Sequence, residues 1–98
     1  MNFSLITRGE ADADIAESRD WYAGQGEGLA QSFLTALDDV FSRIRETPRL
    51  YAAGYRGIRL AGLRRFPYFV HYRILGDRLE VIAVLRGNRD PRIGRSRL

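Results

Sequence analysis

The spacing of apolar residues changes at Pro48, and this change constrains the fold more than any other feature of the chain. Ahead of Pro48 the apolar positions recur at the spacing of one face of an α-helix, namely Leu29, Phe33, Leu37, Val40, Phe41 and Ile44. Beyond Pro48 apolar and polar residues alternate, which is the pattern of a half-buried β-strand. The sequence therefore predicts helices in the first half of the chain and a sheet in the second.

The first half is expected to hold a short strand followed by two helices. Residues 2–7 alternate as a strand does, and Thr7 and Glu10 have the spacing of a capping box at a helix start. Glycines between positions 24 and 28 end this helix. Pro48 ends the second one, because proline disfavours a helical residue before it. We expect an αα-hairpin.

The second half is expected to form an antiparallel meander over residues 58–63, 66–75 and the segment after Gly76-Asp77. That dipeptide is a two-residue hairpin turn signal, and such a turn fixes the register. The expected pairs are Leu75 with Arg78, Ile74 with Leu79, Arg73 with Glu80, Tyr72 with Val81, and His71 with Ile82. The predicted fold class is α+β with the order β-α-α-β-β-β, a helical hairpin packed on a twisted antiparallel sheet.

Length and composition limit the classes of function. The chain has 98 residues, no cysteine and one histidine, so we expect one domain over residues 1–98, with a basic tail over 86–98. A zinc site needs about four Cys or His ligands, so neither a metal site nor a cofactor is expected. No apolar run approaches the roughly 18 residues that cross a bilayer. We therefore expect no membrane partner and a cytoplasmic location.

The charge is distributed unevenly along the chain. All 16 basic residues are arginine, which excludes Schiff-base and lysine general-base chemistry. Residues 1–47 carry a net charge of −5 and residues 48–98 a net charge of +9. A basic half attracts nucleic acid or an acidic protein, because steering depends on the sign of the charge.

The arginines of the second half are the main candidates for binding, because guanidinium groups contact carboxylates and phosphates bidentately. They alternate along the chain with tyrosines 51, 55, 68 and 72. A plain RNA- or DNA-binding module and a merely solvated basic face are the alternatives. His71 is the first candidate for a general base, yet no Ser, Cys or carboxylate is placed to complete a relay. The carboxylates of the first helix are expected to be solvated.

An ordered set of residues resembles the toxin subunits of the RelE/ParE superfamily over nearly the whole chain. The set comprises Ala11, Asp14-Ile15, Trp21-Tyr22, Gly28-Leu29, Phe33-Leu34, Leu37, Ile44, Pro48, Arg64-Arg65-Phe66-Pro67-Tyr68, Tyr72-Arg73, Val84-Leu85 and Arg89-Asp90-Pro91. The resemblance implies a toxin of a type II toxin–antitoxin pair that is held inactive by a co-expressed antitoxin. It also implies that a mostly disordered part of the antitoxin folds on the toxin.

Two toxic activities occur in this superfamily. RelE-like members cut messenger RNA in the ribosome with basic residues on the sheet, whereas ParE-like members poison DNA gyrase by binding it. Phe69 stands at a sheet position that is commonly basic in the ribonucleases, and the chain has no lysine. We therefore expect a ParE-like toxin that is not an enzyme, with the ribosome-dependent messenger RNA endonuclease as the alternative.

The candidate site residues follow from this choice. For target binding we expect Arg59, Arg64, Arg86 and Arg89, on one shared concave surface. For antitoxin binding we expect the helical hairpin and the open face of the sheet, through Tyr22, Leu29, Phe33, Phe69, His71 and Arg73. Tyr22 and Phe33 also fit the core of the hairpin. In a RelE-like enzyme, Arg59, His71 and Arg89 would stabilise the attacking oxygen and the phosphate charge.

Overall fold

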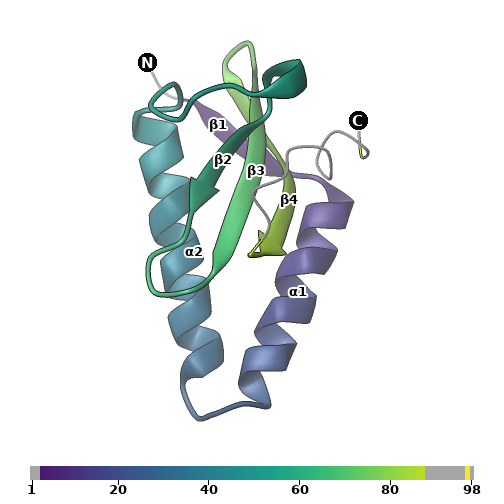
Figure 1. Cartoon of the computed structure of the whole chain (residues 1–98), viewed down its shortest axis with the longest axis vertical. Helices are drawn as coiled ribbons and strands as arrows, with labels where there is room; N and C mark the ends of the chain where they lie inside the picture. Colours follow the sequence, from purple (N-terminus) through teal and green to yellow (C-terminus); the bar gives the residue numbers. More distant parts are fainter. Residues whose placement is uncertain (1–2, 88–96, 98) are drawn as a thin grey trace.

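The computed structural model describes residues 3–87 and residue 97, and it contains the predicted elements in the predicted order. The elements are β1 (Ser4–Thr7), α1 (Gly9–Ala23), α2 (Leu29–Glu46), a 3₁₀ turn (Tyr55–Gly57), β2 (Arg59–Gly62), β3 (Tyr68–Leu75) and β4 (Arg78–Arg86). The two helices form one layer and the sheet forms the other (Figure 1). Of the predicted basic tail, Arg86 belongs to β4, and residues 88–96 and 98 lie outside the described residues.

The sheet is mixed, whereas the sequence predicted a wholly antiparallel one. Its strand order is β1-β4-β3-β2, and β2, β3 and β4 form the expected antiparallel meander. β1 lies beside β4 at the edge but runs parallel to it. The alternation of a four-residue strand identifies its buried face and not the direction of its neighbour, so the sequence pattern could not reveal this orientation.

Counted from the turn, the register of the hairpin between β3 and β4 is confirmed as far as Tyr72 and then shifts by one residue. Leu75, Ile74, Arg73 and Tyr72 oppose the predicted partners in β4. His71, however, opposes Ala83 and not Ile82, because a β-bulge separates the His71 and Tyr72 pairs. The extra residue in β4 bends the strand locally and increases its twist.

The start of α1 differs from the predicted capping box. Arg8 occupies the N-cap and makes no side-chain cap hydrogen bond. The Thr7 hydroxyl donates instead to Asp12 Oδ1, at 2.5 Å. The loop between the helices ends at Gly28, whose φ of +78° is left-handed and favours glycine.

Aromatic rings form the centre of the core between the two layers. Phe33 of α2 lies 5.4 Å from Tyr22 of α1 and 5.0 Å from Tyr68 of β3, measured between ring centroids. Phe66 packs edge-on against both Tyr22 and Phe33. Burial raises the pKa of the Tyr22 hydroxyl. These contacts hold the helical hairpin against the sheet and fix the position of the surfaces on either side of it.

Candidate functional surface

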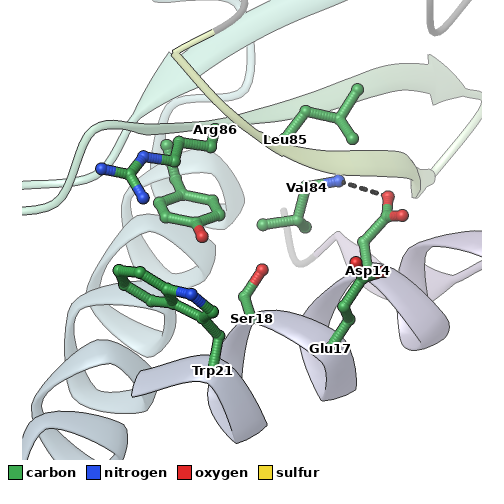
Figure 2. A pocket seen from close by; sticks show the side chains of 8 residues that line it. Asp14, Glu17, Ser18, Trp21, Val84, Leu85 and Arg86 are labelled. Carbon is green, nitrogen blue, oxygen red and sulfur yellow. Dashed lines mark hydrogen bonds between the residues drawn. The ribbon is translucent and has the colours of Figure 1, made fainter. Parts of the chain in front are cut away.

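A pocket of about 270 Å³ lies between α1 and the end of β4 (Figure 2). Its lining comprises Asp14, Glu17, Ser18, Trp21, Tyr68, Val84, Leu85 and Arg86. The Trp21 side chain is 47% exposed, and the Arg86 guanidinium carbon lies 5.2 Å from its ring centroid. This cation–π contact holds a positive charge beside an exposed indole, which is a combination that is enriched at binding surfaces.

A second and larger cavity, of about 520 Å³, lies between α2 and the loop that joins β2 to β3. The lining residues are Gly28, Gln31, Ser32, Thr35, Ala36, Asp39, Arg64, Arg65 and Phe66. Arg64 is exposed, and its Nε atom is 3.9 Å from Asp39 Oδ2. Arg65 has a φ of +71°, so a non-glycine residue holds a left-handed conformation beside this cavity. Two guanidinium groups therefore line a cavity that has Phe66 and Ala36 as apolar members.

The three predicted target-binding residues that the structure describes do not line one common pocket. Arg86 lines the pocket at α1, Arg64 lines the cavity at α2, and Arg59 lines neither of them. The Arg59 guanidinium is half-buried and donates a hydrogen bond to the Tyr51 carbonyl. Arg89 lies outside the described residues. The separation follows from topology, because β4 ends at α1 whereas the β2–β3 loop crosses α2.

The two described residues of the alternative catalytic set, Arg59 and His71, do not meet either. Arg59 pairs with Tyr72 across β2 and β3, so both side chains point to the same face of the sheet. His71 precedes Tyr72 in β3 and therefore points to the opposite face. The His71 side chain is also fully buried. The structure thus places the single imidazole of the chain away from Arg59 and from solvent.

The six residues predicted to bind an antitoxin divide into core and surface. Tyr22 and Phe33 are buried in the aromatic core, and His71 is buried on the other face of the sheet. Leu29, Phe69 and Arg73 are half-buried. Arg73 Nε donates to Glu80 Oε1 at 2.8 Å, which is the predicted cross-strand pair. Phe69, His71 and Arg73 alternate along β3, so they lie on one face of the sheet as expected.

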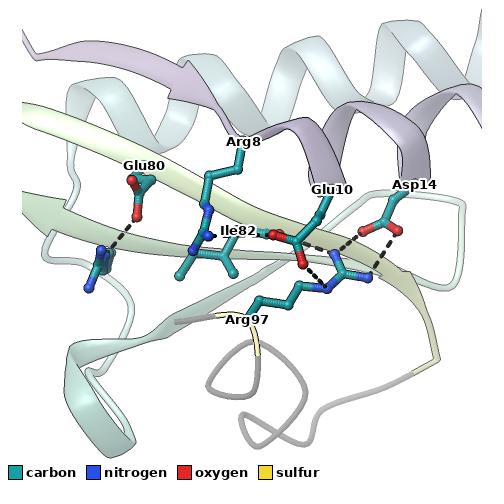
Figure 3. Close-up of polar contacts among 7 residues, drawn as sticks. Arg8, Glu10, Asp14, Glu80, Ile82 and Arg97 are labelled. Atoms are coloured by element: carbon teal, nitrogen blue, oxygen red, sulfur yellow. Dashed lines mark hydrogen bonds and ion pairs between the residues drawn. The ribbon is translucent and has the colours of Figure 1, made fainter.

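Sequence reasoning missed a polar cluster that joins α1, β4 and Arg97 (Figure 3). The Asp14 carboxylate was expected to be solvated, yet its side chain is only 13% exposed. It accepts hydrogen bonds from the Val84 N–H (3.0 Å) and from both terminal nitrogens of Arg97 (2.7 and 3.2 Å). These hydrogen bonds to Asp14 raise the pKa of the Arg97 guanidinium. No local signal could identify the pair, because 83 positions separate the two residues.

Two classes of site are not found in the part of the chain that the structure describes. Among residues 3–87 and 97 no three His, Asp or Glu side chains are grouped so that they could hold a metal ion. Within the same residues neither helix has the length and apolar character that a membrane-spanning segment needs.

Comparison with known proteins gives one consistent result. A family model described as "ParE toxin of type II toxin-antitoxin system, parDE" matches residues 5–91. Proteins called Toxin ParE2 from two Mycobacterium tuberculosis strains are each 28% identical to this chain over 92 residues, which is 93% of this chain and 88% of theirs.

The fold is also similar to two solved structures. The first is a chain of a chromosomal ParDE TA system from P. aeruginosa, with a TM-score of 0.76 and 19% identity over 88% of this chain and 97% of that one. The second is a mutant of the E. coli toxin RelE in the free state, with a TM-score of 0.61 and 19% identity over 99% of this chain and 94% of that one.

Proposed function

Because the chain belongs to the ParE toxin family of type II toxin–antitoxin systems, we propose that it arrests growth by binding and inhibiting DNA gyrase. The family match over residues 5–91 is the observation that carries this proposal. In the same proposal, the toxin acts in the cytoplasm and a cognate antitoxin neutralises it by forming a complex. A binding mode of action needs an accessible surface and no catalytic residues.

The position of His71 supports binding over catalysis. A general base must come within hydrogen-bond reach of the proton that it removes, and His71 is fully buried. Arg59, the sheet arginine of the alternative catalytic set, points to the other face and is held by the Tyr51 carbonyl. An endonuclease that uses these two side chains together would require the sheet to rearrange.

Arg64 and Arg86 are the target-binding residues that this proposal retains. Both are exposed at the surface, each beside a cavity with aromatic lining. Their guanidinium groups can contact carboxylates of a protein target bidentately. Because they line different cavities, the target would contact both sides of the helical hairpin. For the antitoxin we retain Leu29 and the β3 face that carries Phe69 and Arg73.

A supercoiling assay with purified gyrase tests the proposal. The chain should inhibit supercoiling, and Arg64→Ala and Arg86→Ala should each raise the concentration that is needed by about three- to tenfold. Arg45→Ala is the matched control, because Arg45 is an exposed arginine on α2 that lines neither cavity. Co-expression of the antitoxin should restore growth.

The same preparation distinguishes the alternatives. Cleavage of messenger RNA in translating ribosomes, with supercoiling unaffected, would replace the gyrase proposal with a RelE-like endonuclease. Nucleic-acid affinity that falls steeply with salt, without growth arrest on expression, would indicate a plain nucleic-acid-binding module.

A further inference from the structure

The cavity between α2 and the β2–β3 loop has two walls of different character. The loop lies beside α2 (Figure 1), and it contributes the guanidinium groups of Arg64 and Arg65 and the ring of Phe66. The wall on α2 is mainly polar and consists of Gln31, Ser32, Thr35, Ala36 and Asp39. The volume of about 520 Å³ lies within the range of ligand sites, roughly 300 to 1,000 Å³. The cavity therefore has room for more than one side chain of a partner.

Arg65 holds a strained backbone conformation at this cavity. Its φ of +71° is left-handed, and that conformation costs free energy in any residue with a Cβ. The side chain is exposed, and it makes no hydrogen bond or ion pair with another described residue. Strained residues of this kind cluster at binding and active sites. The Arg65 guanidinium is therefore free to pair with a group of a partner.

Phe66 gives the cavity a fixed apolar wall. Its ring packs edge-on against Tyr22 and Phe33, with centroid distances of 5.1 and 5.6 Å. Both of these rings are buried in the core, so Phe66 cannot turn away without loosening the core. An apolar side chain that packs on Phe66 thus meets a surface that is ordered before binding, which lowers the entropy lost on association.

The charge of the lining selects the kind of partner. Arg64 and Arg65 carry two positive charges and Asp39 one negative charge, which leaves a net charge of +1. Asp39 is held in place by Arg43 Nε at 3.2 Å and by Arg64 Nε at 3.9 Å. One carboxylate balances the remaining charge. A nucleic-acid strand brings a negative charge with every nucleotide and would place the excess beside Asp39. The lining therefore favours a segment of a protein.

We propose that this cavity receives a short segment of the protein target in which a carboxylate stands next to an aromatic or aliphatic side chain. The inference rests on the proposed function, since it states what the target presents to this side of the toxin. The carboxylate pairs bidentately with the Arg65 guanidinium, and the apolar side chain packs against Phe66. The hydroxyls of Ser32 and Thr35 donate to carbonyls of the segment. Arg65 thereby joins Arg64 as a target-binding residue.

Arg65→Gly tests the inference in a protein that stays folded, because glycine adopts a φ of +71° without strain. The variant should be at least as stable in thermal denaturation as the unchanged chain. It should nevertheless need about ten times the concentration to inhibit purified gyrase in the supercoiling assay, because the pairing with the carboxylate is gone. A loss of inhibition without a loss of stability is an outcome that misfolding cannot produce.

Arg56→Gly is the matched control. Among the described residues, Arg56 is the only other non-glycine residue with a positive φ, which is +57°. It is exposed and lines neither cavity. The substitution therefore removes the same charge and the same kind of strain, and it should leave inhibition of gyrase unchanged. An equal loss of inhibition in the two variants overturns the inference.

A dipeptide titration tests the chemistry of the cavity on the full chain. The probe is an acetylated and amidated dipeptide of aspartate and phenylalanine, and the readout is the chemical shift of backbone amides. The signals of Ser32, Thr35 and Phe66 should move. The matching dipeptide of asparagine and phenylalanine should bind about fivefold more weakly, because it lacks the charge that pairs with Arg65. Equal binding of both, or no shift at about 10 mM, overturns the inference.

The remaining outcomes separate this inference from the proposed function. If the unchanged chain and Arg65→Gly inhibit gyrase equally well, the cavity is not a target site and gyrase remains the target. If the unchanged chain leaves supercoiling unaffected, the proposed function is rejected and the inference falls with it. A single-stranded oligothymidylate that binds this cavity more tightly than the aspartate dipeptide, and less tightly to Arg65→Gly, would make nucleic acid the occupant and overturn the inference.

Discussion

The Tyr72 hydroxyl donates a hydrogen bond of 2.7 Å to the Pro48 carbonyl, inside the protein. This bond joins the middle of β3 to the residue at which the helical half of the chain ends. The Pro48 carbonyl lies one residue beyond Thr47, the C-cap of α2, so no N–H of the helix donates to it. Proline also has no N–H of its own. Tyr72 therefore satisfies a backbone group at the junction between the two halves.

Tyr72→Phe should lower the free energy of unfolding by about 1 to 2 kcal/mol. The variant keeps the ring and removes the hydroxyl, which leaves a buried carbonyl without its donor. Urea denaturation measures the change. Ser42→Ala deletes an exposed hydroxyl on α2 and should change the free energy of unfolding by less than about 0.5 kcal/mol. Equal effects of the two substitutions would contradict the role of the Tyr72 bond.

Stability should also decline at alkaline pH. Burial raises the pKa of Tyr72 to about 12, whereas a tyrosine in the unfolded chain has a pKa of about 10. The unfolded state therefore loses this proton first, and the free energy of unfolding falls as the pH rises from about 10 through 12. Denaturation midpoints between pH 8 and 12 measure the decline, which Tyr72→Phe should make shallower. If the stability of Tyr72→Phe falls with the same slope, groups other than Tyr72 cause the decline.

Arg65→Gly should raise the free energy of unfolding by about 0.5 to 1 kcal/mol. Arg65 has a φ of +71°, a conformation that glycine adopts without the steric cost borne by other residues. Arg64 is not among the residues with positive φ, so Arg64→Gly should lower stability by increasing the freedom of the unfolded chain. Thermal denaturation of the two variants should therefore move the midpoint in opposite directions. Parallel shifts would contradict the argument from backbone strain.

A double-mutant cycle should detect the energy of the ion pair between Asp14 and Arg97. Both side chains are mostly buried and joined by two hydrogen bonds, so their coupling should be about 1 to 2 kcal/mol. Each single variant also removes one hydrogen bond to β4: Asp14→Ala removes the acceptor of the Val84 N–H, and Arg97→Ala removes the donor to the Ile82 carbonyl. The cycle subtracts both losses and leaves the coupling of the pair. A coupling near zero in chemical denaturation would show that the pair contributes no net stability.

Local patterns predicted most of the fold. The change of spacing at Pro48 separated helices from strands, and the Gly76-Asp77 turn gave four correct pairs between β3 and β4. The sequence did not predict the bulge opposite His71, because no glycine or proline marks that part of β4. The direction of β1 could not be predicted either, because both helices separate β1 from its partner β4 along the sequence.

The candidate site was less predictable from sequence than the fold. Residue type showed that arginines dominate the second half, but it could not show that Arg64 and Arg86 line separate cavities or that Arg59 points away from His71. From the sequence, Tyr22 and Phe33 could belong either to the core or to a binding surface. Tyr22 packs against Phe66 and Phe33 packs against Tyr68, which places both in the core. Such assignments depend on contacts between distant segments.

The parallel pairing of β1 with β4 has a consequence for synthesis. Ser4 and Thr7 find their neighbours at Arg78 and Val81, which are among the last residues of the sheet to be made. A nascent chain stopped before Arg78 holds both helices and β1, yet it lacks the strand against which β1 pairs and much of the sheet surface that α1 covers. The ribosome therefore has to complete residues 78–81 before β1 can pair with β4.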